Sequence, residues 1–452
     1  MSRRLFGTDG IRGVAGLSPL TPELVLALGR AVAHHFRQAG EFPKVVMGQD
    51  TRRSCSMLQG AMSAGLCAAG ADVVDVGVLP TPAISHLVRE LRACAGVMIS
   101  ASHNPFADNG IKLFGADGFK LSDEQELALE QALHNPSIQQ QHLSGEDIGT
   151  ITSYATQGLE SYLERLICSL PPQTRLSGLR VVVDVGYGAA ARAARPLFER
   201  LGADVTVLHT EADGQNINRG CGALHPERLQ EVVRAQRADL GVALDGDADR
   251  LILVDEQGDV RDGDYCMAVL AEAALRRGLL PQKTVVATQM SNLGLELYLQ
   301  RRGVELIRTG VGDRYVVQAM REGQHPLGGE QSGHVILLEH ATTGDGLLAA
   351  LQVAAEVKVR GVKLSELLEG WHVLPQVLLN VRLKTRKPLE TLTSVMDAIE
   401  RARQVLGPEG RVLVRFSGTE PLARVMIEGR DAVQIHQLAG EIAEKIAEEL
   451  NA

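Results

Sequence analysis

Three Val-rich segments recur along the chain and constrain its fold more than any other feature. They read PKVVMGQD from Pro43, LRVVVDVG from Leu179 and QKTVVATQ from Gln282. In each segment a basic or polar residue precedes a β-branched run, a polar turn ends the run, and a helical pattern follows. A β-branched run between turn signals is typical of a buried parallel strand. We interpret these segments as the first strands of three successive α/β domains.

The C-terminal region has a different pattern, which predicts a smaller α+β domain. Strand-like segments at residues 377–383 and 411–416 alternate with helical patterns. The last helix presents one apolar face at helical spacing, formed by Ile435, Leu438, Ile442, Ile446 and Leu450. Breaks in periodicity at residues 134–153, interpreted as a linker, at 255–259 and near 369–375 separate the regions. The predicted domains are residues 1–153, 154–256, 257–370 and 371–452.

Length and composition fit a large globular protein that does not act mainly on nucleic acid. A chain of 452 residues suggests about three domains. Its 46 basic and 55 acidic residues give a net charge of −9, which disfavours nucleic acid as the main partner. Residues 54–71 are uncharged but carry several serines, which predicts an amphipathic helix and no membrane span. We expect no membrane association.

The cysteines and the first residues both favour a cytoplasmic protein. The six cysteines are scattered and form no C-x-x-C pair, so we interpret them as reduced packing residues. The first ten residues lack the apolar stretch of a secretory signal. The expected location is therefore the cytoplasm.

The tetrapeptide that begins at Ser102 is the strongest candidate for a reactive site. It reads SHNP and follows the apolar run Ala95–Ile99, which predicts a buried strand. Since Pro105 opposes a direct continuation into a helix, Ser102 should lie on a tight turn at the carboxyl end of that strand. Open α/β sheets place their reactive groups there, and a hydroxyl can carry a phosphoryl group if cations lie nearby. Lys112 is a candidate for the same site, although a lone lysine is more often a solvated surface charge.

A second candidate site is an acidic loop with carboxylates at every other position. Asp245, Asp247 and Asp249 follow an apolar run, and Arg250 comes next. Three carboxylates on a turning backbone can converge on a hard cation such as Mg²⁺, and Arg250 suits a phosphate. A solvated turn is disfavoured because three acids so close repel one another without a cation.

Two other uses of the acidic loop need weighing. A calcium-binding EF-hand loop is disfavoured, because Arg250 stands where that loop requires glycine and a strand pattern follows. A phosphatase of the haloacid dehalogenase type, with Asp245 as nucleophile, stays open on this loop alone.

Two further segments have the composition of ligand-binding loops. The segment RFSGTEP offers amides, hydroxyls and arginines to a phosphate, through Arg415, Ser417, Gly418, Thr419 and Arg424. In residues 328–334, Glu330, Ser332 and His334 alternate before a strand pattern, which places them on one face, suited to sugar hydroxyls. An ordinary polar loop explains the second segment equally well. The glycine-rich turn at residues 7–13 carries Arg12, fits no nucleotide fingerprint and by itself indicates a tight loop.

Taken together, the four loops resemble those of the α-D-phosphohexomutase superfamily. They stand in the order expected for that superfamily and span nearly the whole chain, at residues 101–105, 245–250, 329–334 and 415–421. The opening FGTDGIRG and Gln331 favour the branch that acts on glucosamine phosphates. The glucose and mannose branch typically has methionine where Gln331 stands.

The resemblance implies three related α/β domains and a C-terminal α+β domain around a central cleft. It implies interconversion of glucosamine 6-phosphate and glucosamine 1-phosphate, toward UDP-N-acetylglucosamine. Ser102 would be a phosphoserine and would bind one Mg²⁺ per chain together with Asp245, Asp247 and Asp249. Two phosphoryl transfers would pass through a 1,6-bisphosphate. Glucosamine 1,6-bisphosphate or glucose 1,6-bisphosphate would recharge the serine as activator.

The resemblance also assigns roles to single residues. Lys112 and Arg250 would stabilise charge, and Lys112 or His334 would be the general base, a choice that the sequence leaves open. The residues expected to bind substrate are Arg12, Glu330, Ser332, Arg415, Ser417, Gly418, Thr419 and Arg424. The expected partner is a small sugar phosphate, and a homodimer is one candidate assembly.

Three alternatives remain beside this interpretation. The chain could act on glucose or mannose phosphates, or it could be the aspartyl phosphatase. It could also be a sugar-phosphate sensor without turnover, but a sensor has no need of a nucleophile such as Ser102.

Overall fold

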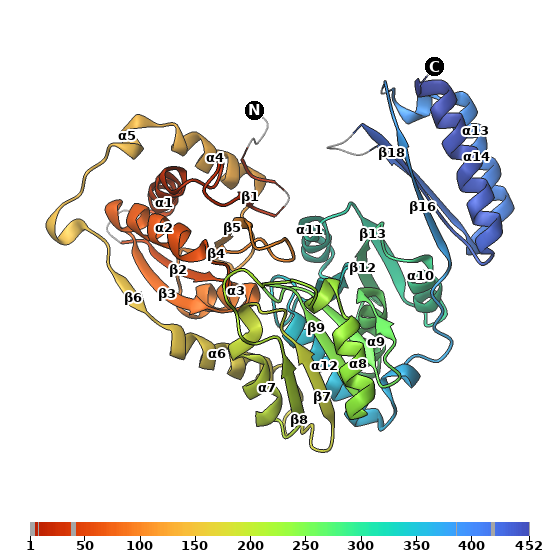
Figure 1. Ribbon diagram of the computed structural model, residues 1–452, viewed down its shortest axis with the longest axis horizontal. Coiled ribbons are helices and arrows are strands. Elements are labelled where there is room, and N and C mark those ends of the chain that lie inside the picture. The colour runs from red at the N-terminus through yellow and green to blue at the C-terminus, as the bar shows by residue number, and fades with distance from the viewer. Residues whose placement is uncertain (1–4, 8, 38–41, 386, 417–420, 452) are drawn as a thin grey trace. The chain divides into compact units, whose positions relative to one another are not determined.

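The computed structural model describes residues 5–7, 9–37, 42–385, 387–416 and 421–451. The chain forms two compact units, each described here by itself. The first unit comprises residues 1–289 and 307–368, and the second comprises residues 290–306 and 369–452. The first unit contains the three α/β regions and the second contains a smaller sheet covered by helices (Figure 1).

The first sheet of the first unit has six strands in the order β1-β5-β4-β2-β3-β6. Its strands are β1 Ile11–Val14, β2 Lys44–Gln49, β3 Asp72–Val78, β4 Ala95–Ile99, β5 Asp108–Gly115 and β6 Ile151–Ser153. Its helices are α1 Pro22–Phe36, α2 Cys55–Ala68, α3 Thr81–Glu90, α4 Asp123–Leu133, α5 Pro136–Gln139 and α6 Ala155–Cys168. Strands β2, β3, β4 and β6 run parallel, whereas β5 is antiparallel to both β4 and β1.

Alternate residues of the central strand β2 face different helices, as the strand period requires. Val45 and Met47 pack in the core with α1 and α2. Gly48 points the other way, where an added Cβ would meet the side chain of Ile84 on α3. Helices therefore cover both faces of this sheet (Figure 1), which explains why its central strands β2 and β4 are largely apolar and buried.

Two details of the first sheet differ from the sequence analysis. The strand β2 is not the first strand, because β1 precedes it at the antiparallel edge. The linker expected at residues 134–153 contains α5 and ends in β6, which pairs in parallel with β3. Polar composition concealed this strand, since all three of its residues are exposed. Asp72 binds the backbone and hydroxyl of Thr150 at the start of the pairing.

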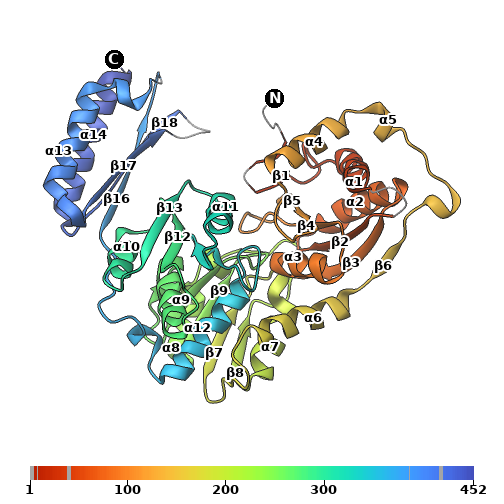
Figure 2. The ribbon, with the colours of Figure 1, turned by 180° about the vertical axis from the view of Figure 1, so that it is seen from behind.

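The second sheet has the order β11-β10-β9-β7-β8. Its strands are β7 Arg180–Asp184, β8 Asp204–Leu208, β9 Leu240–Leu244, β10 Leu251–Asp255 and β11 Val260–Arg261. Its helices are α7 Ala194–Arg200, α8 Glu227–Gln236 and α12 Gly346–Arg360. Gly241 on β9 approaches α8, whereas the neighbouring Leu244 side chain approaches α12, so these helices lie on opposite faces (Figures 1 and 2).

The third sheet has the order β13-β12-β14-β15 and is covered by α9 and α11. These elements are α9 Gly263–Arg277, β12 Thr284–Thr288, β13 Glu305–Thr309, α11 Asp313–Gly323, β14 Leu327–Gly329 and β15 Val335–Leu337. Each of the three segments predicted from the Val-rich pattern is thus a strand with parallel neighbours. The predicted fold class, α/β with a different C-terminal domain, is confirmed.

The second unit contains a three-stranded antiparallel sheet in the order β16-β18-β17. Its elements are α10 Leu293–Gln300, β16 Gln376–Arg382, α13 Thr393–Leu406, β17 Arg411–Phe416, β18 Leu422–Glu428 and α14 Ala432–Asn451. The apolar face predicted for the last helix packs on this sheet together with α13.

Short 3-10 helices lie at residues 145–147, 189–192, 222–224, 364–366, 389–391 and 407–409. Among the described residues, every helix is too short or too polar to cross a membrane.

The core of the second unit depends on α14, and Ile442 is at its centre because its side chain is fully buried. We expect Ile442→Ala to lower the free energy of opening of the β16-β18-β17 sheet by about 2–5 kcal/mol, through lost apolar burial and the cavity that remains. Hydrogen exchange of the amides in that sheet measures the change. The neighbouring Glu441 is exposed, so Glu441→Ala is the control. Equal exchange in the two variants would contradict this account of the core.

Candidate active site

Ser102 lies in the hairpin that connects β4 to β5, immediately beyond the carboxyl end of β4. Its backbone has a φ of 54°, a left-handed conformation that is costly for a residue with a Cβ. Its side chain is buried, and its Oγ donates a hydrogen bond to Asp245 Oδ2 over 2.5 Å. The predicted turn is therefore present, and it aims the hydroxyl at the acidic loop of the neighbouring sheet.

The buried guanidinium of Arg52 holds the serine loop in this shape. It donates hydrogen bonds to the carbonyl oxygens of Ser102, Asn104, Pro105 and Asp108. Four backbone acceptors of one loop are thus satisfied by one planar side chain. The sequence analysis did not select Arg52, because a basic residue after a strand carries no information about a distant hairpin.

Asp50 and Asn218 complete the support of this loop. The carboxylate of Asp50 accepts from Arg52 Nε over 2.9 Å and from the hydroxyl of Ser100 over 2.6 Å. Ser100 Oγ in turn accepts the backbone N–H of Ser102 over 2.9 Å. From the second sheet, Asn218 Nδ2 donates to the carbonyl of Ser102 over 2.9 Å. The position of the hydroxyl is therefore fixed from both sheets.

The acidic loop connects β9 to β10 and brings its three carboxylates together. Asp245, Asp247 and Asp249 are buried, and one oxygen of each lies within 4.8 Å of the others. The loop approaches the serine loop so closely that a Cβ on Gly246 would lie 2.6 Å from the carbonyl oxygen of Ser102. Only glycine fits there. Ala248 in the same loop also adopts a left-handed φ, of 56°.

Lys112 reaches the acidic loop from β5, where it pairs with Met98 of β4. Its buried ammonium lies 2.7 Å from Asp247 Oδ2, 2.8 Å from Asp249 Oδ2 and 3.4 Å from the carboxylate of Asp9. Burial alone would lower the pKa of Lys112, but these three carboxylates outweigh burial and raise it well above its usual value. Lys112 is therefore a cation in this site, not a solvated surface charge.

The carboxylates have the oxygen atoms that a hard cation needs. Among the described residues, Asp247 Oδ1 and Asp249 Oδ1 are buried and have no hydrogen-bond partner. Burial and the charges of Asp249 and Asp247 raise the pKa of Asp245 well above its usual value. Buried, unpaired carboxylate oxygens are costly unless an ion binds them. The donor set fits Mg²⁺, with Ser102 Oγ as a fourth oxygen beside the three acids.

Arg250 and His103 border the serine and the acids. The backbone N–H of Arg250 donates to Asp245 Oδ1 over 3.2 Å, and its guanidinium lies 3.9 Å from the carboxylate of Asp249. His103 Nδ1 lies 3.3 Å from Ser102 Oγ. Burial, together with the charge of Arg250, lowers the pKa of His103 to about 4. The imidazole is therefore neutral at pH 7.

A second set of charges, which the sequence analysis did not select, ties the first sheet to α11. Lys120 Nζ donates to Asp9 and, over 2.5 Å, to Asp313 Oδ2 at the start of α11. Asp9 also accepts from Arg12, the one residue of its turn that the sequence analysis selected. Asp9 therefore lies between Lys112, Lys120 and Arg12. No spacing rule connects these positions, because they lie on segments far apart in the chain.

The segment at residues 330–334 is a tight turn between β14 and β15, so the prediction that it alternates along one face is wrong. The N–H of Glu330 donates to the carbonyl of His334 over 2.9 Å and closes the turn. Glu330 and His334 are buried, whereas Ser332 is exposed. His334 Nε2 lies 3.6 Å from Asp313 Oδ2, which connects this turn to the charges around Lys120.

The arginines of the fourth loop lie opposite each other in the second unit. Arg415 on β17 pairs with Arg424 on β18 in the antiparallel register. Burial and the charge of Arg424 lower the pKa of Arg415. Ser417, Gly418 and Thr419 lie outside the described residues.

Comparisons with known proteins identify the family of this chain. Residues 3–140, 160–258 and 262–374 match models described as phosphoglucomutase/phosphomannomutase alpha/beta/alpha domains I, II and III, and residues 378–445 match the C-terminal domain of that family. The chain belongs to the phosphoglucomutase/phosphomannomutase family. The resemblance found in the sequence is therefore confirmed.

Individual relatives show which phosphoglucomutase/phosphomannomutase branch the chain is similar to. The phosphoglucosamine mutase of Symbiobacterium thermophilum is 51% identical over 448 residues, which are 99% of each chain. That of Geotalea daltonii is 47% identical over 445 residues, 98% of each chain.

Two solved structures have the same fold as this chain. A phosphoglucomutase/phosphomannomutase family protein from Burkholderia thailandensis matches with a TM-score of 0.80 and 26% identity over 99% of this chain and 98% of its own. An N-acetylphosphoglucosamine mutase from Aspergillus fumigatus, solved with GlcNAc-6P and magnesium, matches with a TM-score of 0.67 and 18% identity over 98% and 96% of the chains.

The role of Arg52 can be tested by stability. We expect Arg52→Met to lower the free energy of unfolding by about 3–5 kcal/mol, because it leaves the buried carboxylate of Asp50 unpaired. Arg53→Met is the matched control, since Arg53 is exposed. Denaturant unfolding of both variants measures the difference. A loss no greater than that of the control would show that Arg52 does not hold the loop.

Proposed function

We propose that this chain interconverts α-D-glucosamine 1-phosphate and D-glucosamine 6-phosphate through a phosphorylated Ser102 and a 1,6-bisphosphate. The observation that carries the proposal is the hydrogen bond from Ser102 Oγ to Asp245 across two sheets. It brings a nucleophilic oxygen to a cation site in a buried setting, which phosphoryl transfer requires. The identity to phosphoglucosamine mutases supports the choice of substrate. An isomerase of this kind would catalyse a step in the synthesis of UDP-N-acetylglucosamine.

The ion proposed for the site is Mg²⁺, one per chain, held by Asp245, Asp247, Asp249 and an oxygen on Ser102. Their buried carboxylate oxygens support this assignment. The Aspergillus fumigatus enzyme of the same fold was solved with magnesium. When bound, such an ion polarises phosphoryl oxygens and neutralises charge that develops on them.

The chain's own residues direct two transfers in opposite order. In the first, a free hydroxyl oxygen of the sugar monophosphate attacks phosphorus, the bond to Ser102 Oγ breaks, and the proton of that hydroxyl passes to Ser102 Oγ. In the second, Ser102 Oγ attacks the other phosphate of the bisphosphate, the bond between that phosphorus and the sugar oxygen breaks, and the proton of Ser102 passes to the freed sugar oxygen. Because the transition state is loose, positioning and positive charge contribute most, and Lys112 and Arg250 supply that charge.

Lys112 and His334 are the two residues proposed to assist these proton transfers. Lys112 is a buried cation and suits proton donation. His334 Nε2 accepts the N–H of Gly344 over 3.2 Å, which assigns the hydrogen of the neutral ring to Nδ1. That Nδ1 is buried without a hydrogen-bond partner among the described residues. We propose that it donates a hydrogen bond to an oxygen of the substrate.

The remaining site residues are proposed to hold the sugar and its other phosphate. Glu330, Ser332 and Arg12 would contact the sugar. Arg415 and Arg424 lie side by side with like charge, which favours an anion between them. With Ser417, Gly418 and Thr419 they would grip the phosphate that is not transferred.

Several further assignments belong to the same proposal. Residues 1–153, 154–256, 257–370 and 371–452 would be its four domains. A 1,6-bisphosphate of glucosamine or glucose would recharge a bare serine. The six cysteines are free thiols, which suits the reducing cytoplasm.

The nucleophile is tested by mass and by rate. We expect the intact protein to carry the mass of one phosphoryl group, and Ser102→Ala to lose both that mass and several orders of magnitude in kcat, since the covalent route is removed. Ser137→Ala, at an exposed position, should change neither. If Asp245→Asn abolished activity, Ser102→Ala stayed active and free phosphate accumulated, the chain would instead be an aspartyl phosphatase.

The substrate is tested by comparing kcat/KM for three 6-phosphates. We expect glucosamine 6-phosphate to exceed glucose 6-phosphate and mannose 6-phosphate, because phosphoglucosamine mutases are 47% and 51% identical to this chain over nearly its whole length. A higher value with glucose 6-phosphate or mannose 6-phosphate would refute the substrate while leaving the phosphoserine route intact.

A further inference from the structure

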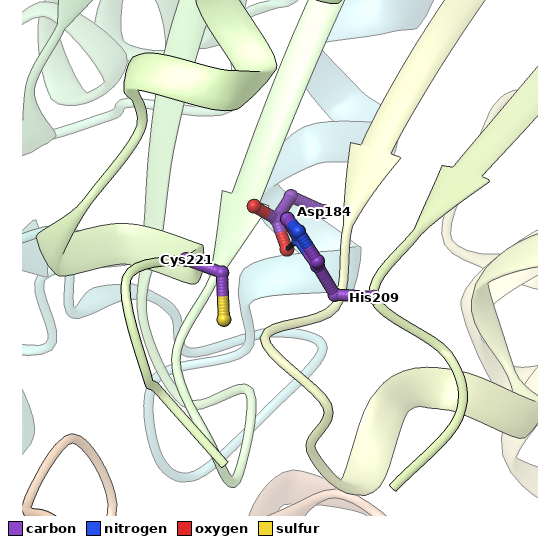
Figure 3. A group of neighbouring side chains, drawn as sticks. All are labelled: Asp184, His209 and Cys221. Carbon is purple, nitrogen blue, oxygen red and sulfur yellow. Dashed lines mark hydrogen bonds and ion pairs between the residues drawn. The ribbon is translucent and has the colours of Figure 1, made fainter. Parts of the chain in front are cut away.

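A second group of metal-ligating side chains lies in the second sheet, apart from the acidic loop. Asp184 ends β7, His209 follows β8, and Cys221 precedes the short 3-10 helix at residues 222–224. Figure 3 shows Asp184 and His209 at the carboxyl ends of two neighbouring strands, with Cys221 on a loop beside them. One ligand atom of each lies within 4.8 Å of the others. None of the three takes part in the proposed phosphoryl transfer.

The carboxylate of Asp184 is fixed in place by the backbone. Its Oδ1 accepts the N–H of Gly186 over 2.9 Å, and its Oδ2 accepts the N–H of Gly222 over 3.0 Å. His209 Nδ1 lies 2.9 Å from Asp184 Oδ1. Two of the three ligand groups are therefore positioned before any ion binds, which lowers the entropic cost of binding.

Cys221 adds a soft sulfur donor to this group of ligands. The side chain is buried, and within the described part of the chain its sulfur has no hydrogen-bond partner. His209 keeps 19% of its side chain exposed, which gives an ion access from solvent.

We propose that Asp184, His209 and Cys221 form a binding site for a thiophilic divalent cation of the Zn²⁺ class. Sulfur, imidazole nitrogen and carboxylate oxygen are the ligands that such ions prefer, and three protein ligands leave a fourth position for water. The acidic triad of the active site offers only oxygen and suits a harder ion. The two sites therefore select different metals.

Binding at this site has a defined balance of bonds and protons. The S–H bond of Cys221 breaks, its proton goes to solvent, and the thiolate binds the ion. The proton on His209 Nδ1 is lost to solvent while Nε2 takes one up, so that Nδ1 can coordinate. Zinc bonds of about 2.3 Å to sulfur and 2.0 Å to nitrogen put ligand atoms about 3.5 Å apart, so ligand atoms that now lie within 4.8 Å of one another need only small shifts to bind one ion.

The site borders the support of the serine loop. The N–H of Asn218 donates to the carbonyl of Gly186 over 2.9 Å, and its side chain holds the carbonyl of Ser102. Asn218 therefore contacts the segment that contains Asp184 and Gly186, and it belongs to the segment that leads to Cys221. An ion bound to Asp184 and Cys221 would connect the two segments that position it.

Cobalt is the probe, because thiolate coordination to Co²⁺ gives a near-ultraviolet charge-transfer band. The full chain is saturated with Mg²⁺, so that the acidic triad is occupied, and titrated anaerobically with Co²⁺. We expect one Co²⁺ per chain to give the thiolate band and Zn²⁺ to displace it. Cys221→Ala should abolish the band. His209→Gln should weaken Co²⁺ binding at least about tenfold.

Cys266→Ala is the matched control, since Cys266 is buried in α9 and belongs to neither site; it should keep the band. If Cys221→Ala does not fold, the partly exposed His209→Gln variant decides. Absence of the band in the wild type, or its persistence in Cys221→Ala, would overturn the proposal, as would unchanged affinity in His209→Gln. None of these outcomes bears on Ser102, so failure here is distinct from failure of the proposed function.

Discussion

The close approach of two loops from different sheets is the constraint on which the rest of the site depends. The serine hairpin and the acidic loop meet where Gly246 lies against the carbonyl of Ser102, with no room for a Cβ. Ser102 and Ala248 both have left-handed backbones at this junction. Such conformations persist only where surrounding contacts over-determine them. Arg52 and Asn218 provide those contacts from the two sides.

Charge compensation extends from this junction through the first unit. Lys112 is buried and Lys120 is partly buried, and each is shared between carboxylates from different elements. Asp9 joins the two lysines, and Asp313 carries the connection to α11. Buried charges are costly to desolvate, and removal of one partner leaves another uncompensated. The network therefore makes three separate sheets depend on one arrangement of loops.

The sequence predicted the site residues that lie within a short local pattern, and it missed those whose partners lie far away along the chain. The strand before Ser102 and the carboxylates around Asp245 were recognised because each lies within a few residues of a clear pattern. Arg52 and Asp9 were not, since their partners lie dozens of residues away along the chain. The alternation predicted around Ser332 was wrong because two short strands separated by a tight turn have a sequence pattern like that of one longer strand.

The position of the Lys112 ammonium has one more consequence. It contacts oxygens of two of the acids that would hold the ion, and Asp9 helps to keep it charged. The lysine therefore serves as a resident counterion, and the acids need not repel one another when the metal leaves. Demetallation by a chelator would then leave a dormant but intact protein that regains its ion without refolding.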